Sequence, residues 1–171
     1  MKPFGIAVAS MMVLIIIVVV IGYSLPVGHR ATVERTVKAA PDTVFRLLTT
    51  FEAFPTWRSG LTSVEMLPSS ASGQLRFREL GADGAITLVV DTMEASRRLV
   101  TRIDDPGLPF GGSWTFELAP AAAGGTSVQI TEDGQVYNPL FRFVSRFVLG
   151  HDRTILRYLD DVERAFAGRP R

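Results

Sequence analysis

The sequence predicts an α+β fold in which a curved antiparallel sheet packs against a long C-terminal helix. Two observations lead to this prediction. Residues 61–136 form short alternating segments separated by turn residues, which is typical of a β-meander. Residues 138–167 carry an apolar stripe at helical spacing. A sheet with one apolar face and a helix with one apolar stripe bury each other in a small domain.

The N-terminal segment adds a helix of another kind. Phe4 to Leu25 contains no charged residue and is long enough to cross a hydrocarbon core of about 30 Å. A cleaved signal peptide is the alternative, but its apolar core is usually shorter, roughly 7–15 residues, and Gly22-Tyr23-Ser24 is a poor cleavage site. We therefore expect an uncleaved transmembrane anchor at 1–26, followed by one domain at 27–171.

The distribution of charge leaves the membrane side of that domain open. Lys2 lies before the apolar segment, whereas Arg30, Arg35 and Lys38 follow it closely, so the positive-inside rule does not decide the orientation. The net charge is +1, which gives no indication of nucleic-acid binding. The chain contains no cysteine, so disulfides, thiolate metal sites and cysteine nucleophiles are excluded.

The first part of the domain combines a strand and a helix. Residues 29–39 alternate as a strand does, and Pro41-Asp42-Thr43 opens a helix with an apolar side. Phe51, Phe54 and Trp57 continue as a helical or turn-like segment that ends near Gly60. Six further strands are expected at 61–67, 74–80, 85–95, 98–104, 113–119 and 126–136.

These strands alternate in a way that defines an apolar sheet face. The residues expected on this face share strand parity, with polar residues between them, and are Leu75, Phe77, Trp114, Phe116, Leu118, Val128 and Ile130. Sheets of this kind are apolar on one side and solvated on the other.

The last segment is expected to be one long helix from Asn138 to Ala167. Asn138 is a suitable cap, and Pro139 fits the first helical position. The expected buried stripe is Leu140, Val144, Phe147, Val148, His151, Ile155, Tyr158, Leu159, Val162 and Phe166. The opposite side, which is expected to be solvated or to contact anions, carries Arg142, Arg146, Arg153, Arg157 and Arg164. Gly150 costs about 1 kcal/mol in a helix interior, so a kink or a close approach of another segment is expected there.

Several motifs together resemble the START/Bet v 1-like (SRPBCC) superfamily, in its polyketide cyclase/dehydrase-like branch. The similarity covers about residues 29–167. It rests on Ala40-Pro41-x-x-Val44-Phe45-x-Leu47-Leu48, Phe51-x-x-Phe54-Pro55-x-Trp57, Gly73-x-Leu75-x-Phe77, Trp114-Thr115-Phe116 and Gly124-Gly125-Thr126-x-Val128. The resemblance implies a helix-grip fold with a deep apolar cavity between sheet and helix. It also places Trp57, Arg58 and the loop 105–112 at the cavity mouth.

Candidate cavity residues follow from strand parity, helix position and this resemblance. His151 is the candidate acid or base because it lies near the centre of the helical stripe, although a structural core histidine is the alternative. Glu79 and Glu132 share parity with core-facing neighbours, and Tyr137 and Tyr158 can supply hydroxyl groups. The expected ligand-binding residues are Trp57, Phe77, Glu79, Trp114, Phe116, Ile130, Phe147, His151, Ile155 and Tyr158.

The expected loop 105–112 has two further interpretations. Gly111 and Gly112 are candidate hinges of a mobile gate, whereas a plain connector is the alternative. Leu108 and Phe110 are candidates for contact with a membrane surface.

Several classes of function have no support in the sequence. His29 and His151 are the two histidines, without an HExxH motif or clustered carboxylates, so no metal site is expected. No glycine-rich phosphate loop and no G-x-S-x-G motif is present, and no cofactor is expected.

Three functions remain as alternatives. The first is a membrane-anchored carrier or sensor that binds a hydrophobic small molecule or lipid in the cavity. The second is a cyclase or dehydratase-like enzyme that uses His151. The third is a protein-interaction domain of the envelope. The state of the cavity distinguishes them: an apolar cavity favours carriage, converging polar groups favour catalysis, and a cavity filled by side chains favours the third function.

Overall fold

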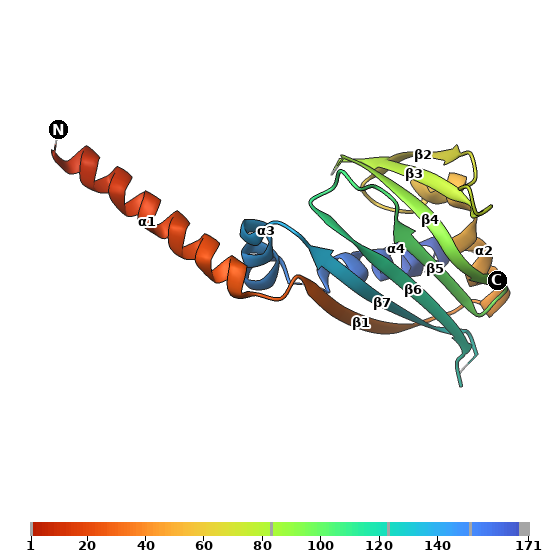
Figure 1. The fold of residues 1–171 in the computed structure, drawn as a ribbon. Coiled ribbons are helices and arrows are strands. Elements are labelled where there is room, and N and C mark those ends of the chain that lie inside the picture. The colour runs from red at the N-terminus through yellow and green to blue at the C-terminus, as the bar shows by residue number, and fades with distance from the viewer. Residues whose placement is uncertain (1, 83, 123, 151, 168–171) are drawn as a thin grey trace.

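The computed structural model describes residues 2–82, 84–122, 124–150 and 152–167. In Figure 1, helix α1 (Lys2–Ser24) projects away from a domain in which a sheet curves around helix α4 (Arg153–Ala167). The α+β, helix-grip architecture expected from the sequence is confirmed.

The sheet has seven antiparallel strands in the order β1-β7-β6-β5-β4-β3-β2. They are β1 (Gly28–Val37), β2 (Leu61–Leu67), β3 (Arg76–Gly81), β4 (Gly84–Glu94), β5 (Arg98–Ile103), β6 (Phe110–Pro120) and β7 (Thr126–Val136). Strands β2 to β7 follow one another as a meander. Strand β1 pairs with β7 and forms the edge of the sheet opposite β2.

Strand β6 begins earlier than the sequence indicated. Gly111 and Gly112 pair with Gln135 and Gly134 of β7, so neither lies in a loop. The interpretation of these two glycines as hinges of a gate is wrong, and the β5–β6 connection is confined to residues 104–109.

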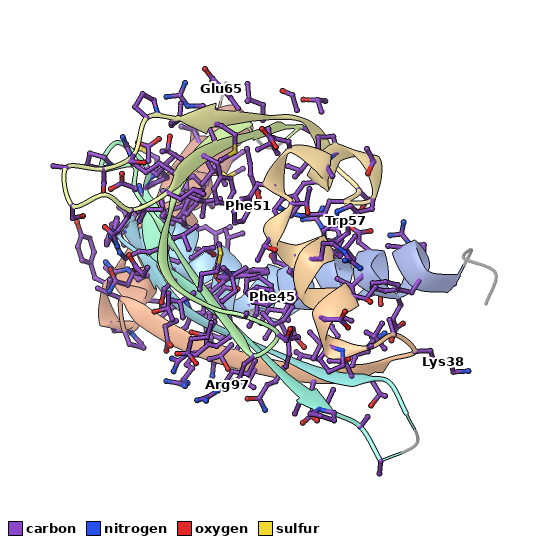
Figure 2. All side chains as sticks on the ribbon, turned by 90° about the vertical axis from the view of Figure 1, so that its right-hand side faces the viewer. Lys38, Phe45, Phe51, Trp57, Glu65 and Arg97 are labelled. Carbon is purple, nitrogen blue, oxygen red and sulfur yellow. The ribbon has the colours of Figure 1, made fainter. Side chains whose placement is uncertain are left out.

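The segment between β1 and β2 covers the end of the sheet far from α1. Helix α2 (Pro41–Thr49) begins after Ala40 and buries Val44 and Leu48. A 3-10 helix, η1 (Phe51–Thr56), then buries Phe51 and Phe54. Figure 2 views the domain from this end and labels Phe45, Phe51 and Trp57 of the segment.

Helix α4 supplies the other half of the core. Its buried apolar side chains are Ile155, Tyr158, Leu159 and Val162, and they meet Phe77, Phe116, Leu118, Val128 and Ile130 of the sheet. The parity of these strands was therefore assigned correctly. Leu75 is the exception, because it precedes β3 and is 36% exposed.

The C-terminal segment is not one continuous helix. Asn138 caps α3 (Pro139–Val144) by accepting a hydrogen bond from the backbone N–H of Leu140 at 2.9 Å. A π-helical turn, η2 (Ser145–Leu149), follows and ends at Gly150, which has φ +75°. The positive φ breaks the helix, so residues 140–147 do not continue the buried stripe of α4. The prediction of a single helix from 138 to 167 was wrong at this point.

Helix α1 is long and apolar enough to cross a membrane over Ala7–Ser24. Little of that helix is buried within the protein, and its large apolar side chains are exposed along its length. An apolar helix that is exposed over most of its length is consistent with a membrane anchor and also with a signal sequence.

Candidate functional site

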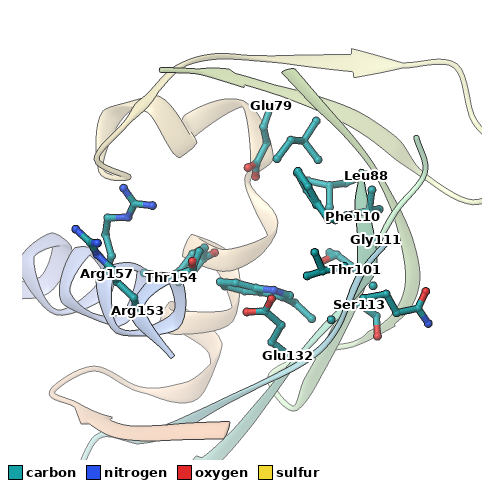
Figure 3. A pocket seen from close by; sticks show the side chains of 18 of the residues that line it. Glu79, Leu88, Thr101, Phe110, Gly111, Ser113, Glu132, Arg153, Thr154 and Arg157 are labelled. Atoms are coloured by element: carbon teal, nitrogen blue, oxygen red, sulfur yellow. The ribbon is translucent and has the colours of Figure 1, made fainter. Parts of the chain in front are cut away.

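A cavity of about 730 Å³ lies between the concave face of the sheet and the helices. Figure 3 shows part of its lining, with residues from β3, β4, β6 and β7 facing α4. Most of the lining is apolar, and a few polar side chains interrupt it. This composition is typical of sites that bind small hydrophobic molecules.

The deep end of the cavity is aromatic. Phe51 stacks on Phe77 with ring centroids 4.2 Å apart, and Phe116 lies 5.3 Å from Tyr158. All four line the cavity and are at most 6% exposed. Burial raises the pKa of the Tyr158 phenol above its usual range, so this hydroxyl group remains neutral.

An ion pair between Arg58 and Glu79 forms one polar part of the wall. Their side chains are 18% and 12% exposed. The guanidinium of Arg58 lies 5.1 Å from the Phe54 ring centroid and 4.7 Å from that of Tyr158. Cation–π contacts and the ion pair together hold this charge at the edge of an apolar cavity.

His29 and Glu132 form a second polar part of the wall. Nε2 of His29 lies 3.4 Å from Oε1 of Glu132, and the side chains are 15% and 19% exposed. The imidazole lies over Gly134, where the Cβ of any other residue would collide with the ring. A glycine at this position of β7 is therefore required for the pair to form.

Burial shifts the pKa values of this pair toward the neutral forms. Desolvation raises the pKa of Glu132 to about 7. The side-chain interaction with Trp114 lowers this pKa, but by less than desolvation raises it. Desolvation lowers the pKa of His29, whereas the negative charge of Asp133 raises it by a smaller amount. Below pH 7 the pair is therefore a protonated carboxyl group beside an imidazole, rather than a strong salt bridge. Oε2 of Glu132 is buried and has no hydrogen-bond partner among the described residues.

The mouth of the cavity lies at the end of the domain nearest α1. Among the lining residues, the exposed ones are Pro109, Phe110, Gln135, Phe141, Gly150, Arg153, Thr154 and Arg157. Figure 3 shows Arg153, Thr154 and Arg157 on α4 at one side of the cavity. Arg153 and Arg157 are exposed, as expected from the sequence, and they also border the cavity.

The expected ligand-binding residues occupy three kinds of position. Five line the cavity: Phe77, Glu79, Trp114, Phe116 and Tyr158. Three pack in or against the core instead: Trp57, Ile130 and Ile155. Phe147 is 59% exposed in η2 and does not line the cavity. His151, the candidate acid or base, lies outside the described residues.

His29 was missed as a cavity residue, although the sequence contains a signal for it. It shares strand parity with Ala31 and Val33, and both of these pack against the core. Its partner Glu132 was identified by the same parity argument. Their proximity depends on the pairing of β1 with β7, which places His29 opposite Gly134, and no local pattern predicts that register.

Among the described residues, no group of three or more His, Asp or Glu side chains is arranged to hold a metal ion. Glu132 and His29 supply two possible ligands, which is fewer than a protein zinc site normally uses.

A protein-family comparison matches residues 28–155 to the family described as polyketide cyclase / dehydrase and lipid transport. The match spans every strand of the sheet and the first residues of α4. A comparison with curated proteins finds no match.

Solved structures share the fold at low sequence identity. The Zhui aromatase/cyclase from Streptomyces sp. R1128 has a TM-score of 0.66 at 16% identity, over 84% of this chain and 96% of that chain. A START superfamily protein from Mycobacterium smegmatis has a TM-score of 0.59 at 19% identity, over 82% and 97%. The protein MLL2253 from Mesorhizobium loti has a TM-score of 0.63 at 18% identity, over 84% and 100%.

Proposed function

Because the chain belongs to the polyketide cyclase / dehydrase and lipid transport family, we propose that it binds a hydrophobic small molecule or lipid in the internal cavity while α1 holds the domain at a membrane. The observation that carries this proposal is the cavity itself. Its volume of about 730 Å³ falls within the range of roughly 300–1,000 Å³ that is usual for small-molecule sites.

The polar groups of the wall orient the ligand. Oε2 of Glu132 is buried without a partner among the described residues, and an unsatisfied buried polar atom costs about 1–3 kcal/mol. A ligand hydroxyl or carbonyl group placed beside it recovers that cost, because the protonated carboxyl group both donates and accepts. The preferred ligand is therefore apolar along most of its length and carries a neutral oxygen group.

Helix α1 determines where the domain encounters such a ligand. Helix α1 is largely exposed over Ala7–Ser24 and contains no Asp, Glu, Lys, Arg or His in that span. A tethered domain with a hydrophobic cavity samples molecules dissolved in the same membrane at high effective concentration. Carriage or sensing of a membrane-soluble compound fits this arrangement.

Native mass spectrometry of the full chain, released from detergent micelles, tests the proposal. We expect a co-purified small molecule, or a mass shift after incubation with a fatty acid or an isoprenoid alcohol. Leu88 lines the cavity, so Leu88→Trp should abolish the shift by filling the space. Met93→Trp is the matched control, because Met93 is 46% exposed on β4. The absence of any bound or added ligand on the wild-type chain would contradict the proposal.

A second candidate function is supported by the pair of His29 and Glu132. A carboxyl group with a pKa near 7 beside an imidazole can transfer protons in a cyclisation or dehydration step. The pair then takes the acid–base role that the sequence suggested for His151. Glu132→Gln should abolish turnover of an aromatic polyketide-like substrate without loss of ligand binding, and turnover that survives this change excludes the role. The interaction-domain alternative gains no support, because side chains do not fill the cavity.

A further inference from the structure

The segment 139–149, which comprises α3 and η2 and is called here the portal segment, exposes an apolar surface. None of the residues of α3 is buried. Leu140 is 43%, Phe141 52% and Phe147 59% exposed. Three large apolar side chains this close together on a solvated surface are uncommon and mark an interaction site.

The portal segment packs on the end of α1. Main-chain atoms of Pro139 occupy the space where a side chain at Gly22 would lie. Arg142 donates a hydrogen bond from Nη1 to the carbonyl oxygen of Leu25 at 2.9 Å, and its guanidinium lies 6.0 Å from the Tyr23 ring centroid. In Figure 1, α3 lies beside this end of α1, between α1 and the sheet.

This contact fixes the depth of the portal segment relative to a bilayer. The apolar span of α1 is the 18 residues Ala7–Ser24, which at about 1.5 Å per residue extends roughly 27 Å. That length matches a hydrocarbon core of about 30 Å, so the last turn of α1 lies at the interface. Tyr23 is 69% exposed there, as is common for aromatic residues at membrane interfaces.

The charged residues of the portal segment are also compatible with a position at the membrane interface. Arg142 and Arg146 are its charged residues, and neither forms an ion pair with a described residue. Apolar side chains combined with basic ones characterise helices that lie in the headgroup region. Basic side chains there also attract anionic lipid headgroups.

The same segment forms one wall of the cavity. Phe141, Val144 and Ser145 line the cavity together with Phe110 and Val136. Phe141 is both exposed and part of the lining. The portal segment therefore lies between the interior of the domain and the region that the bilayer occupies beside α1.

We propose that the portal segment lies in the bilayer interface and forms a lipid-facing opening, through which a membrane lipid passes between the bilayer and the cavity. This inference rests on the proposed binding function and specifies its partner, the bilayer that holds α1. The positive φ at Gly150 separates the portal segment from α4, so the segment can shift against the bilayer without displacing the core helix.

Depth measurements on the full chain in vesicles test the position of the portal segment. The native chain has no cysteine, so Leu140→Cys and Phe147→Cys each introduce one site for a spin label. Met93→Cys is the control, because Met93 is 46% exposed near the β4–β5 turn, at the end of the sheet away from α1. In phosphatidylcholine and phosphatidylglycerol vesicles, we expect the labels at 140 and 147 to be accessible to oxygen and protected from a water-soluble relaxant. Labels at 140 and 147 as water-accessible as the label at 93 would overturn the proposal.

Lipid uptake tests the opening itself. Leu140→Asp combined with Phe147→Asp should slow loading of a fluorescent fatty-acyl lipid from vesicles by about tenfold, which corresponds to about 1.4 kcal/mol in the barrier. Loading from detergent micelles at equilibrium should be unchanged, because neither residue is part of the cavity lining. Met93→Asp is the control for added charge. Unchanged uptake from vesicles refutes the opening while binding stands, whereas a wild-type chain that loads no lipid from either source refutes the binding function and the opening with it.

Discussion

The carboxylate of Asp161 accepts hydrogen bonds from both the backbone N–H of Ser59, at 2.8 Å, and its side-chain hydroxyl group, at 2.9 Å. Asp161 belongs to α4 and is 2% exposed, whereas Ser59 lies between η1 and β2. Arg164 also contacts the carboxylate. The Asp161 side chain therefore connects the residues that follow η1 to helix α4.

Asp161→Ala should lower the free energy of unfolding by about 2–4 kcal/mol, because the two Ser59 donors lose a buried, charged acceptor. Denaturant unfolding of the full chain in detergent, followed by tryptophan fluorescence, measures the loss. Asp160→Ala is the matched control. Its carboxylate pairs with Arg35 at 3.0 Å but is 53% exposed, so the expected change is below about 1 kcal/mol. Equal effects of the two substitutions would contradict the role given to Asp161.

The pair of Arg58 and Glu79 gives a second prediction of stability. Glu79→Gln leaves the guanidinium of Arg58 without its carboxylate in a wall where both side chains are less than one-fifth exposed. We expect a loss of about 2–3 kcal/mol, because an unpaired buried charge is costly. Glu65→Gln is the control, since Glu65 pairs with Arg78 at 3.5 Å and both side chains are more than 40% exposed. A loss no larger than that of the control would show that the pair is solvated.

Glu132 makes stability depend on pH. Burial raises its pKa to about 7 in the folded protein, above the value of about 4.3 expected in the unfolded chain. The folded state therefore binds more protons between these values, and stability falls as pH rises from about 4.5 to 7. His29 acts in the opposite direction, because burial lowers its pKa and the unfolded chain binds the extra proton below about 6.5.

Glu132→Gln isolates the carboxyl contribution to this pH dependence. Relative to the wild type, the variant should gain stability at pH 8, by about 1–2 kcal/mol after allowance for partial solvent exposure of the carboxyl group. At pH 4.5 the two proteins should differ little. Unfolding curves measured at both pH values test this expectation, and a constant difference between the proteins at the two pH values would contradict the raised pKa.

Gly150 gives a prediction about the break between η2 and α4. Its φ of +75° and ψ of 153° form a backbone conformation that costs about 1–3 kcal/mol for a residue with a Cβ, so Gly150→Ala should destabilise the protein by that amount. Gly107→Ala is the control, because Gly107 is exposed and has no positive φ. Thermal unfolding of both variants provides the comparison. A neutral Gly150→Ala would mean that α3, η2 and α4 join without a break.

The strands were predictable because their signal is local. Phe77 and Ile130 reveal their burial by alternation alone, and both are at most 1% exposed. Helix α2 was likewise predictable from Pro41 and the apolar residues Val44 and Leu48. Each prediction needed information from about ten neighbouring residues, which the sequence contains.

Features that depend on distant contacts were not predictable in the same way. The cost of Gly150 in a helix was visible, but the packing of Pro139 against Gly22 depends on contact between the two ends of the chain. The break at Gly150 separates Leu140 and Phe147 from the stripe of α4. The proximity of His29 to Glu132 depends on the register between β1 and β7, which alternation does not determine. Part of the cavity wall could therefore be predicted from the sequence, whereas the contact between His29 and Glu132 could not.

The pairing of β1 with β7, from Gly28 opposite Gln135 to Val37 opposite Thr126, has a consequence for biosynthesis. A ribosome adds roughly 5–20 residues per second, so the last strand follows the first after about 100 residues, or several seconds. During that time α1 has already left the ribosome, and β1 has no partner along its edge. We expect α1 to enter the membrane before β7 pairs with β1. We also expect a chain truncated before Val136 to keep an unpaired strand edge and therefore to aggregate.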